Sequence, residues 1–426
     1  MLRSQMCALA LVFLTLTQTP APQTPLSGVK RDALLNGLQI IVLDTPAPRV
    51  RCDLLIRGGS MFDLAGRAGL AAVTQETLLA VNPRLHEEIE SLEGTINWGL
   101  GYDESWFRLD IPQKNFETAL EIVSRLLITE NIRADAFKRA KEAQIEKVRQ
   151  IEQSLTPAVR ADRALADGLY GQHPYARSID GTEATVSAIV HGDVLDFYKR
   201  VYIANDSSVI VTGPIGPERV MRTFRVLFGS WVKGPLVPPT FRQPARTTDV
   251  KVLKVNVADS PKVELRGGLI GLQVTDKDFL ITQVLARILQ ERLKQSFGPD
   301  SPDTIKAFAV DRVLPGPVFF SASIPPDKAP QVSRAATDAF AAFAANPPSE
   351  AELASAKASL KGDKAAMTVA DQLFEVERFG LPKNTPLTWP TRLDAVTAAE
   401  VQRVARRLLE ANALTVIVLG PTTERS

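Results

Sequence analysis

A segment near the middle of the chain recurs near its end. The stretch DVLDFYKRVYIANDSSVIVTGP (residues 193–214) aligns without a gap with EVQRVARRLLEANALTVIVLGP (residues 400–421), at a constant offset of 207 residues that pairs Arg200 with Arg407. Each copy is typical of a helix, a short turn that contains asparagine, and a buried strand that ends at Gly-Pro. A long ungapped self-match of this kind indicates one domain, about 200 residues long, that occurs twice.

The remaining segments of both halves predict the same kinds of element. Alternating stretches such as GLQIIVLD in the first half and VKVLKVNV in the second predict strands, and stretches such as NFETALEIVSRLL and FLITQVLARILQERL predict amphipathic helices. Clustered strands with long helices between hairpins favour antiparallel-rich sheets with helices packed on one face. We therefore predict an α+β fold made of two homologous α/β sandwich-like domains from an internal duplication.

A Pro-rich stretch separates the two copies. The sequence KGPLVPPTFRQPAR lacks apolar periodicity, as a linker does. We predict a leader at residues 1–27, an N-terminal domain at residues 28–232, a linker at residues 233–247 and a C-terminal domain at residues 248–426.

The first residues are typical of a secretory leader. Arg3 precedes an apolar run at residues 6–16, which is too short to span a bilayer but suits the core of a signal peptide. We therefore expect export to the periplasm or cell envelope, with an uncleaved leader that anchors the chain as the alternative. Once the leader is removed, Cys52 is the only cysteine, so no internal disulfide is expected.

The charge balance argues against two classes of partner. The chain has 50 basic and 48 acidic residues, for a net charge of +2, and no lysine- or arginine-rich run. Proteins that bind nucleic acid or anionic membranes usually carry a basic patch, so neither partner is expected.

Four segments together resemble one known family. They are NGLQIIVLD, GLAAVTQETLL, HPYARSIDGTEATVSAIVHGDVLDFYKRVYIANDSSVIVTGP and LDAVTAAEVQRVARRLLEANALTVIVLGP. Over residues 34–421 the chain resembles the pitrilysin/insulinase-type zinc peptidases. The resemblance is to their small two-domain members in particular, such as the subunits of mitochondrial processing peptidase and bacterial relatives.

The catalytic motif of that family is changed at all three of its positions. Active members carry H-x-x-E-H, in which the histidines bind zinc and the glutamate acts as general base. Over GLAAVTQET the histidines fall on Ala72 and Glu76, and the glutamate falls on Gln75. Alanine has no ligand atom, glutamine cannot take up a proton, and one carboxylate is not a zinc site. The resemblance thus implies a chain with no catalytic residues and no zinc or other cofactor of its own.

The family's third zinc ligand is a glutamate on a later helix. Counting forward from Glu76 by the family's spacing reaches Glu152, whereas counting back from HPYARSIDGT points nearer to Arg149. The two counts disagree, and the position of the third ligand stays open.

The second half of active members supplies an arginine and a tyrosine that stabilise the oxyanion. Here LQERLKQSF offers Arg292 for the arginine. All five tyrosines lie at or before Tyr202, and Phe308 falls near the tyrosine position. The resemblance implies that the arginine is retained and that the hydroxyl is lost.

Active members also hold their substrate peptide against an edge strand. The stretch EGTINWGLGYDES keeps Gly94 and Asn97 of the family's pattern, and Trp98 and Tyr102 alternate along it, where they could flank an extended peptide. A strand that only packs against the core and binds nothing is the alternative.

Two functions follow as expectations. The first is a catalytically inactive subunit of a heterodimeric zinc peptidase, which forms half of a chamber for unstructured peptides. Its partner would be a homologous subunit with an intact motif, and only that partner would hold zinc. The alternative is a non-proteolytic scaffold or peptide-binding protein of the cell envelope. The sequence does not distinguish a heterodimer from a homodimer.

Overall fold

The computed structural model describes most of the chain. The described residues are 26–128, 132–236, 251–257, 260–297, 304–411 and 414–420. The predicted leader, apart from its last two residues, and most of the predicted linker lie outside these ranges. No helix in these ranges is both long and apolar enough to span a membrane.

The first half forms a six-stranded sheet with the order β1-β2-β6-β3-β5-β4. Its strands are β1 (Lys30–Ala33), β2 (Gln39–Asp44), β3 (Val50–Ile56), β4 (Thr95–Leu100), β5 (Ser105–Ile111) and β6 (Ser207–Gly213). Only β2 and β6 run parallel, and the other neighbouring pairs are antiparallel.

The second half repeats this sheet, and within the described residues, which omit 237–250 before its first strand, no strand corresponds to β1. Its strands are β7 (Lys251–Asn256), β8 (Val263–Ile270), β9 (Lys306–Ala309), β10 (Pro317–Ile324) and β11 (Thr415–Gly420). Their order is β7-β11-β8-β10-β9, and again only one pair, β7 and β11, is parallel. The repeated segment supplies the corresponding strands β6 and β11. The matching order and directions confirm the predicted duplication and the α+β class.

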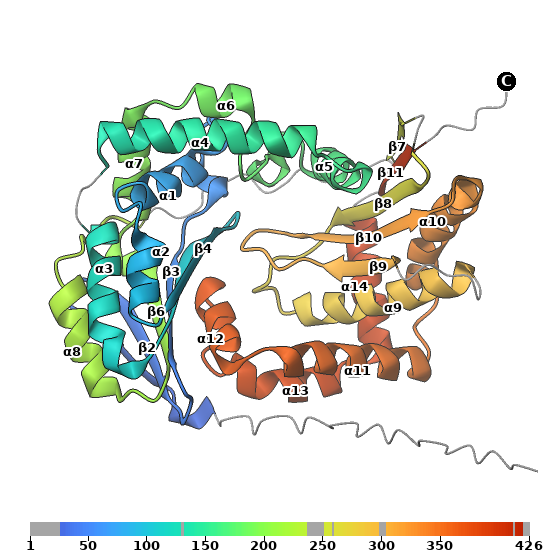
Figure 1. Ribbon diagram of the computed structural model, residues 1–426. Coiled ribbons are helices and arrows are strands. Elements are labelled where there is room, and N and C mark those ends of the chain that lie inside the picture. The colour runs from blue at the N-terminus through green and yellow to red at the C-terminus, as the bar shows by residue number, and fades with distance from the viewer. Residues whose placement is uncertain are drawn as a thin grey trace, which may run out of the picture.

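The helices fill the connections between the strands in both halves (Figure 1). In the first half they are α1 (Leu70–Leu79), α2 (Leu85–Ser91), α3 (Phe116–Ile128), α4 (Ala134–Gln153), α5 (Pro157–Tyr170), α6 (Glu183–Ser187), α7 (His191–Val201) and α8 (Pro217–Phe228). In the second half they are α9 (Phe279–Phe297), α10 (Ala329–Ala345), α11 (Glu350–Ala366), α12 (Val369–Arg378), α13 (Thr385–Ala395) and α14 (Ala398–Ala411). Each half buries its main apolar core between its own helices and one face of its own sheet.

One helix of each half packs on the sheet of the other half (Figure 1). Helix α5 lies on β8 and β11, where Leu165 and Leu169 join an apolar cluster with Ile417. Helix α12 lies on β3 and β6, where Leu373 meets Ile210. The exchanged helices cover part of the sheet face that each half's own helices leave open, so the two halves are interlocked.

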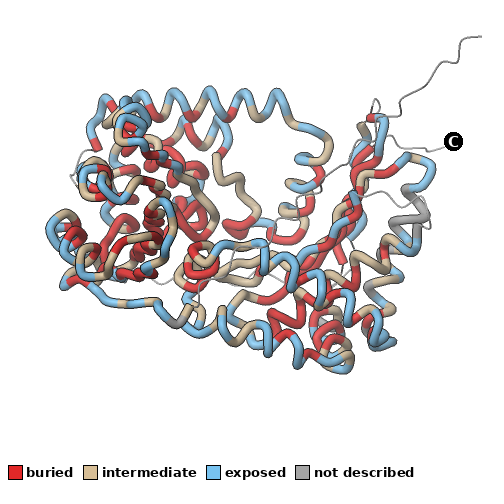
Figure 2. Tube along the Cα trace, turned by 60° about the horizontal axis from the view of Figure 1, so that its bottom comes forward, coloured by how far each residue is buried: buried red, intermediate tan, exposed pale blue. Residues whose placement is uncertain are grey.

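Strand β2 shows how the sequence encodes a sheet that is covered on both faces. Ile40 and Val42 belong to the core of the first half, whereas Ile41 and Leu43 belong to the cluster under α12. Because successive side chains of a strand point to opposite faces, a continuous apolar run is what such a strand requires. Figure 2 shows the same pattern along the chain, with buried residues concentrated on the strands and exposed residues on the outer helices.

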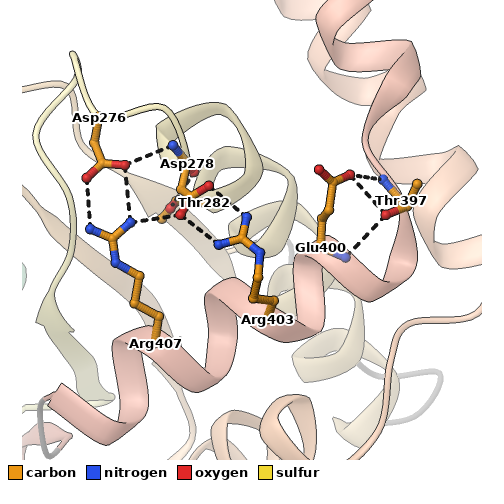
Figure 3. A network of polar contacts seen from close by, with 7 residues as sticks. All are labelled: Asp276, Asp278, Thr282, Thr397, Glu400, Arg403 and Arg407. Carbon is orange, nitrogen blue, oxygen red and sulfur yellow. Dashed lines mark hydrogen bonds and ion pairs between the residues drawn. The ribbon is translucent and has the colours of Figure 1, made fainter.

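The arginine shared by the two sequence repeats has a corresponding contact in each half. Arg200 on α7 donates to the carbonyl of Phe62 at 3.3 Å, in the segment between β3 and α1. Arg407 on α14 binds Asp276 at 2.9 Å, just before α9 (Figure 3). Each arginine thus holds the segment that leads from β3 to α1 or from β8 to α9.

A second arginine strengthens this contact in the second half (Figure 3). Arg403 and Arg407 both bind Asp278, and their hydrogen bonds lower the pKa of this carboxyl to about 2. The start of α9 is therefore fixed by charge as well as by packing.

Candidate functional site

Helix α1 begins at a turn that admits only glycine. Gly69 has φ +93°, and a Cβ there would lie 2.7 Å from the carbonyl oxygen of Asp180. The carboxylate of Asp63 accepts hydrogen bonds from the backbone N–H groups of Gly69 at 2.7 Å and Ala71 at 2.8 Å. Burial raises the pKa of Asp63 to about 7, against the opposing effect of these N–H groups. The start of the helix that carries the motif positions is therefore fixed by these hydrogen bonds.

The residues at the three motif positions make protein contacts and leave no ligand set. Ala72 and Gln75 are buried, at 6% and 4% exposure. Gln75 Nε2 donates to the carbonyl of Gly99 on β4 at 3.1 Å. A glutamate at this position could not make that bond, because an ionised carboxylate has no hydrogen to donate. Gln75 therefore ties α1 to the edge of the sheet.

Glu76 is half-buried and faces a lysine. Burial raises the pKa of Glu76, the nearby Lys147 ammonium on α4 opposes this, and Asp180 reinforces it. Lys147 Nζ also binds Asp180 Oδ1 at 2.8 Å. The segment of α4 that faces the motif thus presents a cation, which disfavours a bound metal ion.

Neither residue reached by counting for a third ligand lies among the charged neighbours of Glu76. Glu152 binds Arg163 on α5 at 2.5 Å, and Arg149 pairs with Glu183 on α6. The residue beside the motif is Lys147, which sequence counting missed. Gln144, one helical turn earlier, is buried and donates to the carbonyl of Asp180, so the helical period of α4 is the signal that could have identified this face.

These residues do not fit a zinc ion. Position 72 offers no ligand atom, the amide of Gln75 is engaged by Gly99, and Glu76 stands beside an ammonium group. Within the described ranges, no group of three or more histidine, cysteine, aspartate or glutamate side chains could hold a metal.

Strand β4 forms the outer edge of the first sheet. Gly94 stands directly before it, and a Cβ there would lie 2.4 Å from Cδ1 of Ile111, so a larger residue would have to displace that side chain. Asn97 is exposed and pairs in register with Arg108 of β5. The strand therefore offers an edge to which an extended chain could add.

Of the two aromatic residues predicted to alternate along this strand, Trp98 lies on β4, whereas Tyr102 does not. Trp98 is half-buried, packs against the core of the first half, and lies 4.8 Å from the His86 ring. Tyr102 falls beyond the end of the strand, and its hydroxyl donates to the carbonyl of Arg177 at 3.0 Å. The Arg312 guanidinium of the second half covers the Tyr102 ring at 4.7 Å. Tyr102 therefore belongs to the contact between the halves, because the chain turns after β4 ends.

The second-half residues are engaged within that half. Arg292 on α9 donates to both carboxylate oxygens of Glu352 on α11, at 2.6 and 3.2 Å, and stacks on Phe343. Phe308 lies on the edge strand β9, with its ring 5.5 Å from that of Phe319. Neither residue has a contact with α1 among those described.

A group of hydrogen bonds and ion pairs joins the two halves, and it was not predicted from the sequence. The Tyr175 hydroxyl donates to Asp103 Oδ1 at 2.6 Å, and the N–H of Val313 donates to Asp103 Oδ2 at 3.2 Å. Nearby, Glu104 pairs with Arg378 of α12 at 2.8 Å, and burial raises its pKa to about 7. The HPY segment is the sequence feature that could have indicated this contact. Its tyrosine, Tyr175, is bonded to the second half through its hydroxyl.

Comparison with known proteins agrees with this architecture. A family model described as "Insulinase (Peptidase family M16)" matches residues 39–183, and one described as "Peptidase M16 inactive domain" matches residues 188–360. An uncharacterized zinc protease of Mycobacterium leprae is 21% identical over 420 residues, which cover 93% of this chain and 92% of that protein.

Two solved structures show the same fold. The peptidase M16 inactive domain from Pseudomonas fluorescens has a TM-score of 0.83 at 19% identity, and the match covers 93% of this chain and 99% of that one. The periplasmic protease PqqL from Escherichia coli has a TM-score of 0.76 at 16% identity, and the match covers 94% of this chain but 48% of that one. With its duplicated fold and both family models matched, this chain belongs to the peptidase M16 (insulinase) family.

Proposed function

We propose that this protein is a catalytically inactive M16 subunit that forms half of a peptide-binding chamber with a homologous, zinc-bearing subunit. The observation that carries the proposal is the contact set around α1. Gln75 donates to Gly99, and Lys147 faces Glu76, so both positions make interactions that stabilise the fold rather than a site. Such a helix can serve as a wall of a chamber without taking part in chemistry.

The length of the chain supports a paired arrangement. It matches 48% of PqqL, so two chains of this size correspond to one chain of that relative. The open edge of β4 supports peptide binding, since an exposed edge pairs with an extended chain through backbone groups whatever its side chains. The apolar run near the N-terminus supports the exported compartment as the place of assembly.

One observation favours a second function, a non-proteolytic scaffold or peptide-binding protein of the cell envelope. A silent subunit would usefully donate oxyanion-stabilising groups to its partner, but here Arg292 is held by Glu352 and Phe308 has no hydroxyl. A neighbouring gene that encodes H-x-x-E-H in a chain of similar length favours the subunit function, and its absence favours the scaffold.

The purified chain is expected to contain no stoichiometric zinc. The reason is the lack of ligand atoms at position 72 together with the Lys147 ammonium beside Glu76. Elemental analysis of protein made without a histidine tag measures this directly. One tightly held zinc ion per chain, retained after dialysis against a chelator, would contradict the inactive assignment.

Capture from the native host is expected to recover a motif-bearing relative. The full chain, tagged at the C-terminus, is used as bait under conditions that preserve the envelope fraction, and bound proteins are identified by mass spectrometry. Recovery of a homologue with H-x-x-E-H at equal stoichiometry supports the subunit function. Recovery of only further copies of this chain would contradict it and favour the scaffold.

A further inference from the structure

The second half contains a small cavity beside α9, α11, α12 and α13. Its volume is about 250 Å³, and its apolar wall includes Phe279, Phe379 and Trp389. Sites for whole small-molecule ligands usually measure roughly 300–1,000 Å³. This cavity therefore has the size for a single side chain or a similarly small group.

The cavity lies at the counterpart of the changed motif in the duplicated fold. Gln75 on α1 donates to the carbonyl of Gly99 on β4, at 3.1 Å. Gln283 on α9 donates to Asp311 Oδ1, just after the corresponding strand β9, at 3.3 Å. Gln75 lies on the first α-helix after β3 and Gln283 on the first α-helix after β8, so the two halves use the same location differently. In the second half this location is open and lined by charged and aromatic side chains.

Most of the charged side chains that line the cavity already have an ion-pair partner. The pairs are Lys364–Glu375, Arg287–Asp363 and Asp276–Arg407. Among the described residues, two lining charges have no ion pair, Asp311 inside the cavity and Arg392, which is exposed. Asp311 therefore lacks an ion pair of its own, although Lys364 and Arg378 act on it from a greater distance.

Asp311 has unused capacity to accept hydrogen bonds. Its side chain receives one described bond, from Gln283, although a carboxylate offers about four acceptor positions. Burial raises the pKa of Asp311 to about 6, Glu375 adds to this, and Arg378 and Lys364 oppose it.

A second polar group in the cavity also lacks a partner. Thr385 Oγ1 is buried without a hydrogen-bond partner in the described part of the chain, and Thr385 lines the cavity. Buried polar groups in native proteins are almost always satisfied, so the unpartnered Thr385 Oγ1, together with the spare acceptor positions of the half-buried Asp311, points to a polar ligand.

We propose that this cavity binds a basic side chain, lysine or arginine, of a captured peptide. Asp311 acts as the counter-ion, Thr385 accepts a further hydrogen bond, and the aromatic wall packs against the aliphatic stem. A charged donor at a carboxylate makes a strong hydrogen bond, aromatic faces attract cations, and long stems of basic residues pack on apolar surfaces. The inference rests on the proposed function for one point only, that the side chain comes from a peptide.

The probe for the test is Nα-acetyl-lysine methylamide, and its matched control is the norleucine counterpart, which keeps an aliphatic chain but lacks the amine. Binding to the full chain is measured by ligand-observed NMR. The lysine probe is expected to bind at least tenfold more tightly than the norleucine probe. Asp311→Asn should remove at least tenfold of that affinity, and Trp389→Leu should weaken it independently.

The matched control variant is Asp338→Asn, which removes an exposed carboxylate on α10 of the same half and should leave binding unchanged. Binding by the parent chain should also weaken as the pH falls through about 6, because protonation neutralises Asp311. Circular dichroism checks that each variant keeps the parental fold.

The outcomes separate this inference from the proposed function. Equal binding of the two probes, preference for an acetyl-glutamate probe, or no effect of both Asp311→Asn and Trp389→Leu would overturn the basic-side-chain site. Zinc content and partner capture are measured on the same protein and do not depend on this cavity. If the lysine probe binds while lysine-containing unstructured peptides do not, the cavity stands and the peptide-chamber function fails.

Discussion

The triple variant Ala72→His, Gln75→Glu and Glu76→His is expected to bind zinc more tightly than the parent chain, without gaining peptidase activity. The three positions share one face of α1 at i, i+3 and i+4, so two imidazoles can approach one ion. Two features of the structure keep this binding weak. The glutamate loses the hydrogen bond to Gly99, and the Lys147 ammonium repels the metal.

Adding Lys147→Glu to the triple variant tests that explanation. The fourth change replaces a repelling cation with a third ligand. We expect the affinity for zinc to rise by at least about 100-fold over the triple variant. Removing a group that only orients a metal ligand lowers affinity by up to about 100-fold, and a direct ligand should contribute at least as much. Competition against a chromophoric chelator, on protein without a histidine tag, measures both affinities.

A control places two histidines at the same spacing on a different helix. The pair Glu121→His and Arg125→His lies at i and i+4 on the exposed face of α3. It should bind zinc no better than the triple variant and gain nothing from Lys147→Glu. An equal response in this control would mean that the pocket around α1 is not responsible.

Peptidase activity is not expected to return in either variant. Phe308 offers no hydroxyl to an oxyanion, and Arg292 is held by Glu352. Loss of one oxyanion donor costs on the order of 10²–10³ in rate. Robust zinc-dependent cleavage of unstructured peptides by the isolated variant would mean that the second half still supplies these groups.

The substitution Glu377→Ala is expected to lower the free energy of unfolding by about 3 kcal/mol. This carboxylate lies at the end of α12, where it pairs with Arg31 and Arg57 and accepts a hydrogen bond from Ser208. Its side chain is 11% exposed and those of the arginines are 19% and 28% exposed. Breaking a fully buried pair costs about 3–5 kcal/mol, and the partial exposure of the arginines places this case at the low end.

Chemical denaturation followed by circular dichroism measures the loss. Glu87→Ala is the matched control, because Glu87 pairs with Arg84 on the surface of α2 with both side chains at least 70% exposed. Such pairs contribute about 0–1 kcal/mol. Equal effects of the two substitutions would mean that the ion pairs of Glu377 contribute little to holding α12 on the first sheet.

The fold could be predicted from the sequence because its signals are local. The helix, turn and strand that recur after 207 residues set the duplication, and GLQIIVLD was predicted as a strand, although only the structure shows that β2 is buried on both faces. The loss of the zinc ligands at Ala72, Gln75 and Glu76 was also readable, since it depends only on residue type at known spacing.

The candidate site was less readable, because its contacts join residues far apart in the chain. Counting along the sequence reached Glu152 and Arg149, but the residue facing Glu76 is Lys147, which the packing of α4 selects. The sequence predicted Tyr102 as part of a strand. In the structure β4 ends before Tyr102, and the Tyr102 ring contacts Arg312 of the second half.

By itself the sequence determined two copies of one α+β domain and the absence of the family's ligands, because repeats, apolar periods and residue types are properties of short segments. Only the tertiary structure decided which groups meet. In the folded chain α5 and α12 pack on the sheet of the other half, Arg292 binds Glu352, and Asp311 lines a cavity with aromatic walls without an ion pair among the described residues. The physical reason is that burial and charge pairing depend on where distant segments pack, and one helix turned by a single residue presents a different side chain.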